Sequence, residues 1–153
     1  PKRLKLHQLV ARALETQYAK RIEEHAAELA EHFSQSTDPA DLAKAVSYGE
    51  IAAQRAASVY AYGEAARLRG QALNVQRVLD PGDRTRICDL LLALGNDFMA
   101  AGEPQRAFNV ELQEAFSLAE AIGDKKRAAR ACLIALQAII IHGGGRAGQL
   151  GHS

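Results

Sequence analysis

Signals that end one helix and start the next recur along this chain, and they constrain its fold more than any other feature. Each combines a glycine or a turn, which favours the end of a helix, with a capping side chain or a proline, which favours the start of the next helix. They lie at residues 37–39, 80–83, 102–104 and 123–124. The chain is therefore predicted to be a series of helices joined by loops of only a few residues.

Apolar residues between these signals repeat with the spacing of amphipathic helices, and no segment alternates as a strand does. Hydrophobic residues make up 48% of the chain and aromatic residues only 5%. The abundance of alanine suits helices that pack closely. Seven helices are predicted, over residues 3–19, 22–36, 39–59, 61–79, 84–101, 104–122 and 125–142.

The predicted loops are short enough to make neighbouring helices antiparallel. Helix starts recur about every 20 residues, so a helical hairpin occupies about 40, as in helical-repeat proteins. We therefore expect an all-α fold in which antiparallel hairpins stack on one another.

One segment of this array carries a more specific pattern. Leu91, Leu94, Gly95 and Phe98 stand at the offsets of the first helix of a tetratricopeptide hairpin. Small residues lie seven apart in two other helices, as they do on the second helix of such hairpins; they are Ala45 with Ala52, and Ala65 with Ala72. Ala107 and Ala115 lie eight apart, which predicts an extra residue or a shifted register there.

Longer stretches resemble the tetratricopeptide-like region of the maltose-regulator type in large bacterial signalling ATPases. They are residues 28–33, which include Leu29 and Phe33, residues 44–48 and residues 60–66. The parent chains of such regions look like either LuxR-type transcription regulators or class III adenylate/guanylate cyclases, and residues 114–124 look especially like the cyclase-linked group. The resemblance implies a right-handed α-solenoid. It divides the chain into a linker helix at 1–21, a repeat domain at 22–142 and a flexible glycine-rich tail at 143–153.

The resemblance also implies a function. We expect a non-catalytic sensor or scaffold that binds a protein partner, a neighbouring domain of its parent chain or a small effector, without a cofactor. Any ATPase or cyclase activity would lie in other domains. Two alternatives stay open: a nucleic-acid-binding helical module, and a fragment without independent activity.

Charge bears on the first alternative. The net charge of +1 argues against a polyanion-binding domain. Basic residues nevertheless gather in the first predicted helix, at Lys2, Arg3, Lys5, Arg12, Lys20 and Arg21. A second basic run opens the last helix, at Lys125, Lys126, Arg127 and Arg130. Solvated helix faces are the simpler interpretation of both runs, and a partner contact is the other.

Few residues suggest chemistry. His25, Glu28 and His32 can share one face of the second helix, but no further metal ligand is identifiable, so a solvated trio is favoured. The glycines at 143, 145 and 148 match a dinucleotide-binding motif without the preceding strand that it requires. Tyr48, Tyr60 and Tyr62 are expected in the core, with a ligand groove as the alternative. No catalytic residue is predicted.

Two isolated cysteines, Cys88 and Cys132, lack the spacing of a metal site and are predicted to be reduced and buried. The apolar cluster at residues 133–141 is too short to span a bilayer, and no signal peptide is evident. We therefore expect a cytoplasmic location and no membrane contact.

Overall fold

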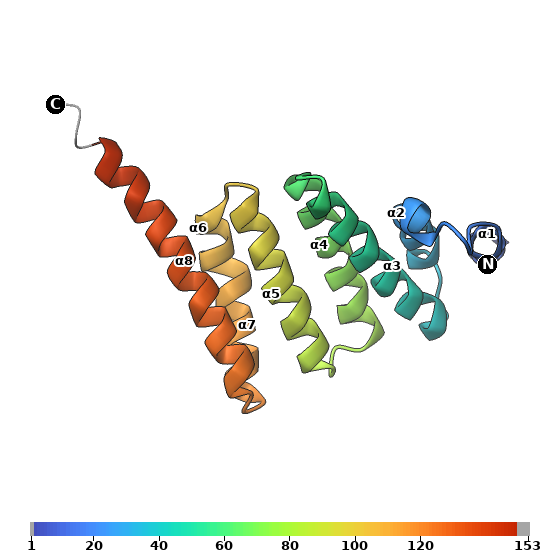
Figure 1. Cartoon of the computed structure of the whole chain (residues 1–153). Coiled ribbons are helices and arrows are strands. Elements are labelled where there is room, and N and C mark those ends of the chain that lie inside the picture. Colours follow the sequence, from blue (N-terminus) through green and yellow to red (C-terminus); the bar gives the residue numbers. More distant parts are fainter. Residues whose placement is uncertain (1, 150–153) are drawn as a thin grey trace. The chain divides into compact units, whose positions relative to one another are not determined.

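The computed structural model describes the backbone of residues 2–149 and the side chains of residues 2–141, and every regular element in it is helical. The elements are α1 (Lys2–Gln17), α2 (Ile22–Ser34), α3 (Pro39–Ser58), α4 (Tyr62–Leu79), α5 (Arg84–Ala100), α6 (Pro104–Arg106), the π-helical turn η1 (Ala107–Glu111), α7 (Leu112–Ala121) and α8 (Lys125–Gln149) (Figure 1). The all-α prediction is confirmed. The chain forms two compact units, residues 1–82 and 83–153, which are described separately.

The predicted capping residues define the helix ends. The Asp38 carboxylate accepts a hydrogen bond from the backbone N–H of Ala40, and Asp83 does the same for Arg86. Gly102 and Gly123 follow α5 and α7 with φ of +83° and +68°, a conformation that glycine adopts without steric cost. Because these signals act locally, the predicted helix ends lie within two residues of the observed ones, except at the end of α8.

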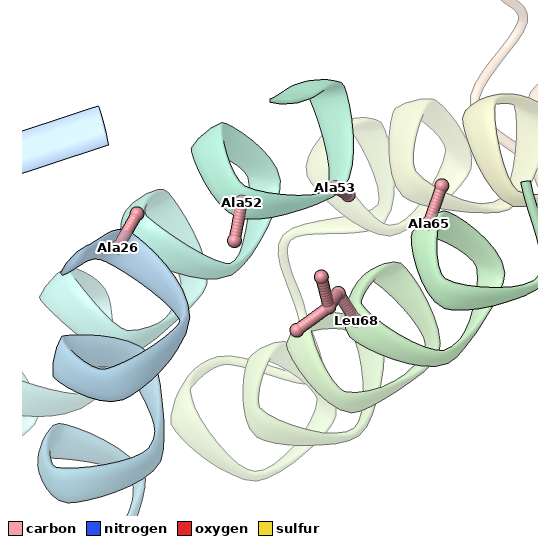
Figure 2. Packing of buried hydrophobic residues seen from close by; sticks show 5 residues of the cluster. All are labelled: Ala26, Ala52, Ala53, Ala65 and Leu68. Atoms are coloured by element: carbon pink, nitrogen blue, oxygen red, sulfur yellow. The ribbon is translucent and has the colours of Figure 1, made fainter. Parts of the chain in front are cut away.

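Small side chains form the core of the first unit. Ala26, Ala52, Ala53, Ala65 and Leu68 are buried together where α2, α3 and α4 meet (Figure 2). On the α3–α4 interface, a Cβ atom at Gly49 would lie 3.1 Å from the Cβ atom of Ala72. The two helices therefore approach so closely that any larger residue at position 49 would push against Ala72.

A second cluster joins α1 to the same unit. Ala11 of α1 is fully buried with Leu29, Phe33 and Ala45, and Leu14 packs against them. Ala11 is the one buried residue of α1. The helix is therefore attached through a narrow apolar strip.

The core of the second unit lies between α5, η1, α7 and α8. Leu90, Leu91 and Leu92 of α5 are buried, as are Leu94 and Gly95. A Cβ atom at Gly95 would lie 2.9 Å from Cδ2 of Leu112. The glycine of the Leu91–Phe98 pattern thus allows α7 to approach α5.

The helix predicted over residues 104–122 is interrupted. At η1, the backbone N–H of Leu112 donates to the carbonyl of Ala107, five residues earlier. The wider turn accommodates the extra residue indicated by the eight-residue spacing, because Ala107 and Ala115 are both fully buried. The insertion is thus absorbed locally, without moving either alanine from the core.

The last helix is also longer than expected, since α8 continues to Gln149 rather than ending near His142. Glycine weakens a helix by about 1 kcal/mol per residue relative to alanine, but it does not block the helix sterically as proline does. The helix therefore continues through residues 143–145. The last part of the predicted tail, residues 150–153, lies outside the described residues.

Candidate interaction surfaces

The predicted His25, Glu28 and His32 trio is divided between two different environments. Nδ1 of His25 lies 3.7 Å from Oε2 of Glu28, and the His25 ring stacks on Tyr18 with ring centroids 3.6 Å apart. His32 instead lies beside His7 of α1, with ring centroids 5.9 Å apart. Among the residues whose side chains are described, no three His, Cys, Asp or Glu are placed to hold a metal ion.

Polar contacts hold the inner face of α1. Nε2 of Gln8 donates to Oγ of Ser36 at 2.8 Å, and this hydroxyl donates to Oδ2 of Asp41, also at 2.8 Å. Arg12 lies 3.4 Å from the same carboxylate oxygen. Asp41 is buried, so the serine hydroxyl and the guanidinium supply interactions that water would otherwise make.

A second polar cluster lies one turn further along α1. Lys44 of α3 donates to Oε1 of Glu15 at 2.8 Å, and the Tyr48 hydroxyl donates to Oε2 at 2.5 Å. Partial burial alone would raise the pKa of Glu15, but the hydrogen bonds from Lys44 and Tyr48 and the Lys44 charge lower it overall. Burial and the Glu15 carboxylate raise the pKa of Tyr48 to about 12. Tyr48 is thus a hydrogen-bond donor and not an activated base.

These contacts were not predicted, because their partners lie 28 to 33 residues apart in the sequence. The opposite face of α1 is open to solvent and includes Leu6 and Leu9. Helix α1 is therefore attached by several hydrogen bonds and ion pairs and by little buried apolar area.

The first unit contains a polar groove of about 550 Å³. Its charged lining consists of Glu23, Glu50, Arg55 and Arg69, and Ser58 and Gln54 add hydrogen-bonding groups. Arg69 is buried, and neither it nor Glu50 is without a partner. The carboxylates and guanidiniums balance, so the groove suits a polar ligand of mixed charge better than a polyanion.

The second unit contains an apolar groove of about 250 Å³ between η1, α7 and α8. Phe108, Leu112, Phe116, Cys132 and Ala135 line most of it. Beside the groove, α8 exposes large aliphatic side chains at Leu133, Leu136, Ile139 and Ile140, and on its other flank it exposes Ile141. Grooves lined in this way accept apolar side chains of a ligand or partner.

The basic run at the start of α8 is partly neutralised. Arg127 makes a two-point contact with Asp89 of α5, at 2.8 and 2.9 Å, and a further contact with Asp124 at 2.6 Å. The hydrogen bonds that Arg127 donates to the carboxylates of Asp89 and Asp124 raise its pKa. Arg127 thus joins α8 to α5, while Lys125, Lys126 and Arg130 are exposed.

The three tyrosines are not all in the core. Tyr48 packs against Phe33, whereas Tyr60 is 81% exposed and meets only the edge of Tyr62 among aromatic rings of the described residues. Tyr60 has φ of +63°. It stands two residues after the end of α3, the position that glycine occupies after α5 and after α7. The exposed position of Tyr60 corrects the expectation of a core residue there.

The cysteine prediction is half right. Cys88 is buried and Cys132 is exposed on α8. Burial, together with the nearby Asp89 carboxylate, raises the pKa of the Cys88 thiol. Cys132 lies on a solvent-exposed side of α8. Because that side is also apolar, the sequence did not indicate which side of the helix would be buried.

Comparison of the chain with protein-family models, curated proteins and solved structures gives no match. Within the part of the chain that the structure describes, no helix has both the length and the apolar character needed to span a membrane. The surfaces themselves therefore carry the functional argument.

Proposed function

We propose that this protein is a non-catalytic interaction module whose second unit binds another protein. The observation that carries the proposal is the row of aliphatic side chains on α8. Leu133, Leu136 and Ile140 are 61%, 54% and 64% exposed and lie beside an apolar groove. Contiguous exposed apolar surface is unfavourable in water unless it is covered, and it is typical of protein-binding sites.

The resemblance to tetratricopeptide-like regions supports the same proposal. The Leu91, Leu94 and Gly95 pattern lies at a close helix contact, as it does in those hairpins. On this proposal the chain is a segment of a bacterial, cytoplasmic multidomain signalling ATPase, linked to a cyclase or a transcription-regulator output. Binding at the second unit would shift the equilibrium between states of the attached domains. The polar groove of the first unit is the candidate site for a small effector.

Photo-crosslinking in the cell that makes the protein tests this function. Leu136→p-benzoyl-phenylalanine places the crosslinker on the aliphatic row, and Glu120→p-benzoyl-phenylalanine places it on an exposed part of α7 as a control. We expect one discrete protein adduct at position 136 and none at position 120. An absence of any adduct at position 136 would contradict the proposal.

The coding sequence on either side of this segment tests the proposed parent. A nucleotide-binding domain upstream would support the signalling-ATPase class. A cyclase upstream or a helix-turn-helix downstream would distinguish the two outputs. Salt-dependent binding of the purified chain to DNA or RNA would instead favour the nucleic-acid-binding alternative.

A further inference from the structure

The exposed residues of α8 follow a regular pattern. Ala129, Leu133, Leu136 and Ile140 are spaced by four, three and four residues, and all are exposed. This spacing places them in one stripe along the helix, as the a and d positions of a coiled coil are placed. We call these four residues the outer stripe.

The outer stripe is distinct from the face by which α8 packs on its own unit. The packed face consists of Ala131, Ile134 and Ala138, all buried. These residues lie on the opposite side of the helix, because at about 100° per residue their mean direction is roughly 160° from that of the outer stripe. The helix is thus apolar on two faces, of which only one is covered within the described unit.

The stripe is continuous with the apolar groove. Cys132 lies beside the stripe and also lines the groove with Phe108 and Phe116. Ile139, 53% exposed, extends the same flank by two turns. The apolar surface thus runs along several turns of α8 and has a recess on one side, which suits the side chains of a single helix packing alongside.

Charge around the stripe identifies the kind of helix that fits. Lys125, Lys126 and Arg130 are exposed at its N-terminal end, while Arg127 is held by Asp89 and Asp124. No acidic residue occurs anywhere in α8. The N-terminal end of the seam therefore has a cationic border, and carboxylates on the partner would balance its charge.

We propose that the outer stripe binds one amphipathic helix of another protein, whose apolar seam is flanked by glutamate or aspartate. The proposal rests on the interaction function above and names the partner class. A second copy of this chain fits less well, because another α8 has no carboxylate to offer. The chain's acidic helix, α2, exposes Glu23, Glu24, Ala27, Glu28 and Glu31, so it has no large apolar side chain on that face.

Two synthetic peptides test the partner class on the full-length chain. Both are 21 residues long with leucine and isoleucine at the seam positions; one is flanked by glutamate and the other by lysine. We expect the glutamate peptide to bind at least about tenfold more tightly at low salt, and added salt to reduce the difference. Fluorescence anisotropy measures binding, and protection of Cys132 from alkylation locates it.

Matched variants locate the site independently. Leu136→Gln should weaken binding of the glutamate peptide at least about tenfold, whereas Val78→Gln, at an exposed aliphatic residue of the first unit, should not. The double variant Lys126→Glu and Arg130→Glu should reverse the preference between the peptides. Because all these side chains are exposed, circular dichroism should show an unchanged fold.

Several results would overturn the inference. Equal binding of the two peptides would contradict the preference for an acidic partner. Unchanged peptide binding by the Leu136→Gln variant would show that the outer stripe is not the binding site. Concentration-dependent dimerisation that Leu136→Gln abolishes would show that the outer stripe binds a second copy of this chain. Binding to phosphatidylserine vesicles that depends on Leu136, without binding of either peptide, would show that the outer stripe binds a membrane surface instead. A crosslinked partner at position 136 with no peptide binding would refute this inference and leave the interaction function standing.

Discussion

Side-chain size decides how closely the helices of each unit approach. Gly49 faces Ala72 between α3 and α4, and Gly95 faces Leu112 between α5 and α7. Gly70 of α4, by contrast, has no atom within 4 Å of the place where a Cβ would lie. Glycine therefore permits a close helix contact at two positions, whereas the third has open space beside it.

We expect Gly95→Ala and Gly70→Ala to change stability in opposite directions. Either substitution gains about 1 kcal/mol of helix propensity. At Gly95 the new Cβ would lie 2.9 Å from Cδ2 and 3.3 Å from Cγ of Leu112, a buried side chain that would have to shift to make room. An overpacking cost of about 1–3 kcal/mol should then exceed the gain. Urea unfolding should show Gly95→Ala less stable and Gly70→Ala more stable than the parent; equal stabilisation would contradict the packing argument.

Tyr60 occupies a position that favours glycine. The N–H of Ala61 donates to the carbonyl of Ala56 and that of Tyr60 to Ala57, the same pattern that ends α5 at Gly102 and α7 at Gly123. A left-handed conformation costs a non-glycine residue about 1–2 kcal/mol. Tyr60→Gly should therefore raise the free energy of unfolding by about 1 kcal/mol, measured by thermal or urea denaturation. A loss of stability would mean that the Tyr60–Tyr62 contact outweighs the strain.

The hydrogen bond from Tyr48 to Glu15 should make stability depend on pH above neutrality. The pKa of Tyr48 is raised from 10.0 to about 12 in the folded protein, so the bond contributes fully below pH 10 and is lost as the pH rises through 12. Tyr48→Phe should lower the free energy of unfolding by about 1–2 kcal/mol at pH 7. The difference between the two proteins should shrink between pH 10 and 12; a constant difference would show that the tyrosine proton is not involved.

Among the elements, η1 shows how a helix accommodates an inserted residue. Ala107 and Ala115 both remain in the core because the π-helical turn contains the extra residue. Within the turn, the buried Glu111 pairs with Arg106 through Oε1, at 3.3 Å, while its Oε2 has no hydrogen-bond partner. Such local irregularities are often associated with function, and this one contains the groove residue Phe108.

Deleting Asn109, an exposed residue of η1, should convert the turn into regular α-helix. The seven-residue spacing between the two alanines would then be restored, so we expect stability to change by no more than about 1 kcal/mol. Deleting Ser117 in α7 is the control. This deletion rotates the part of the helix after residue 117 by about 100° relative to the part before it. Either Ala119 or the pair Leu112 and Ala115 must then leave the core, at a cost of several kcal/mol. If both deletions lower helicity and the free energy of unfolding by similar amounts, in circular dichroism and urea unfolding, then η1 does not contain an inserted residue.

For the molecule as a whole, the exposed aliphatic surface is the main departure from an ordinary soluble surface. Within the second unit, α8 presents Ile134 to the core and Ile140 to solvent. The first unit also exposes aliphatic residues, such as Leu6, Leu9 and Val78, but it adds ion pairs and hydrogen bonds around α1 and a polar groove. The two units thus offer chemically different surfaces to partners.

The same substitution on the two faces of α8 should separate folding from association. Ile140→Gln should change the free energy of unfolding by less than about 0.5 kcal/mol, yet reduce binding of a hydrophobic dye and concentration-dependent light scattering. Ile134→Gln should destabilise by about 2–4 kcal/mol, because it places an amide in the apolar core. If Ile140→Gln is as destabilising as Ile134→Gln, the outer stripe is covered by the protein itself.

Much of the local structure was predictable from the sequence. Asp38 with Pro39, Asp83, Gly102 and Gly123 locate helix ends because capping and left-handed turns depend on residues only a few positions apart. The eight-residue spacing of Ala107 and Ala115 likewise indicated an irregular helix. The right-handed solenoid and the signalling-ATPase parent remain predictions that rest on resemblance, and the interaction function remains a proposal that rests on the exposed surface of α8.

The sequence by itself determined the all-α class, the helix boundaries and the small-residue positions, because these follow from helical periodicity and local capping. Only the tertiary structure decided that Glu15 meets Lys44 and Tyr48, that His25 and His32 separate, and that Cys132 is exposed. It also decided which of the two apolar faces of α8 is buried. These outcomes depend on how residues distant in the chain pack together, and periodicity within a single helix does not contain that information.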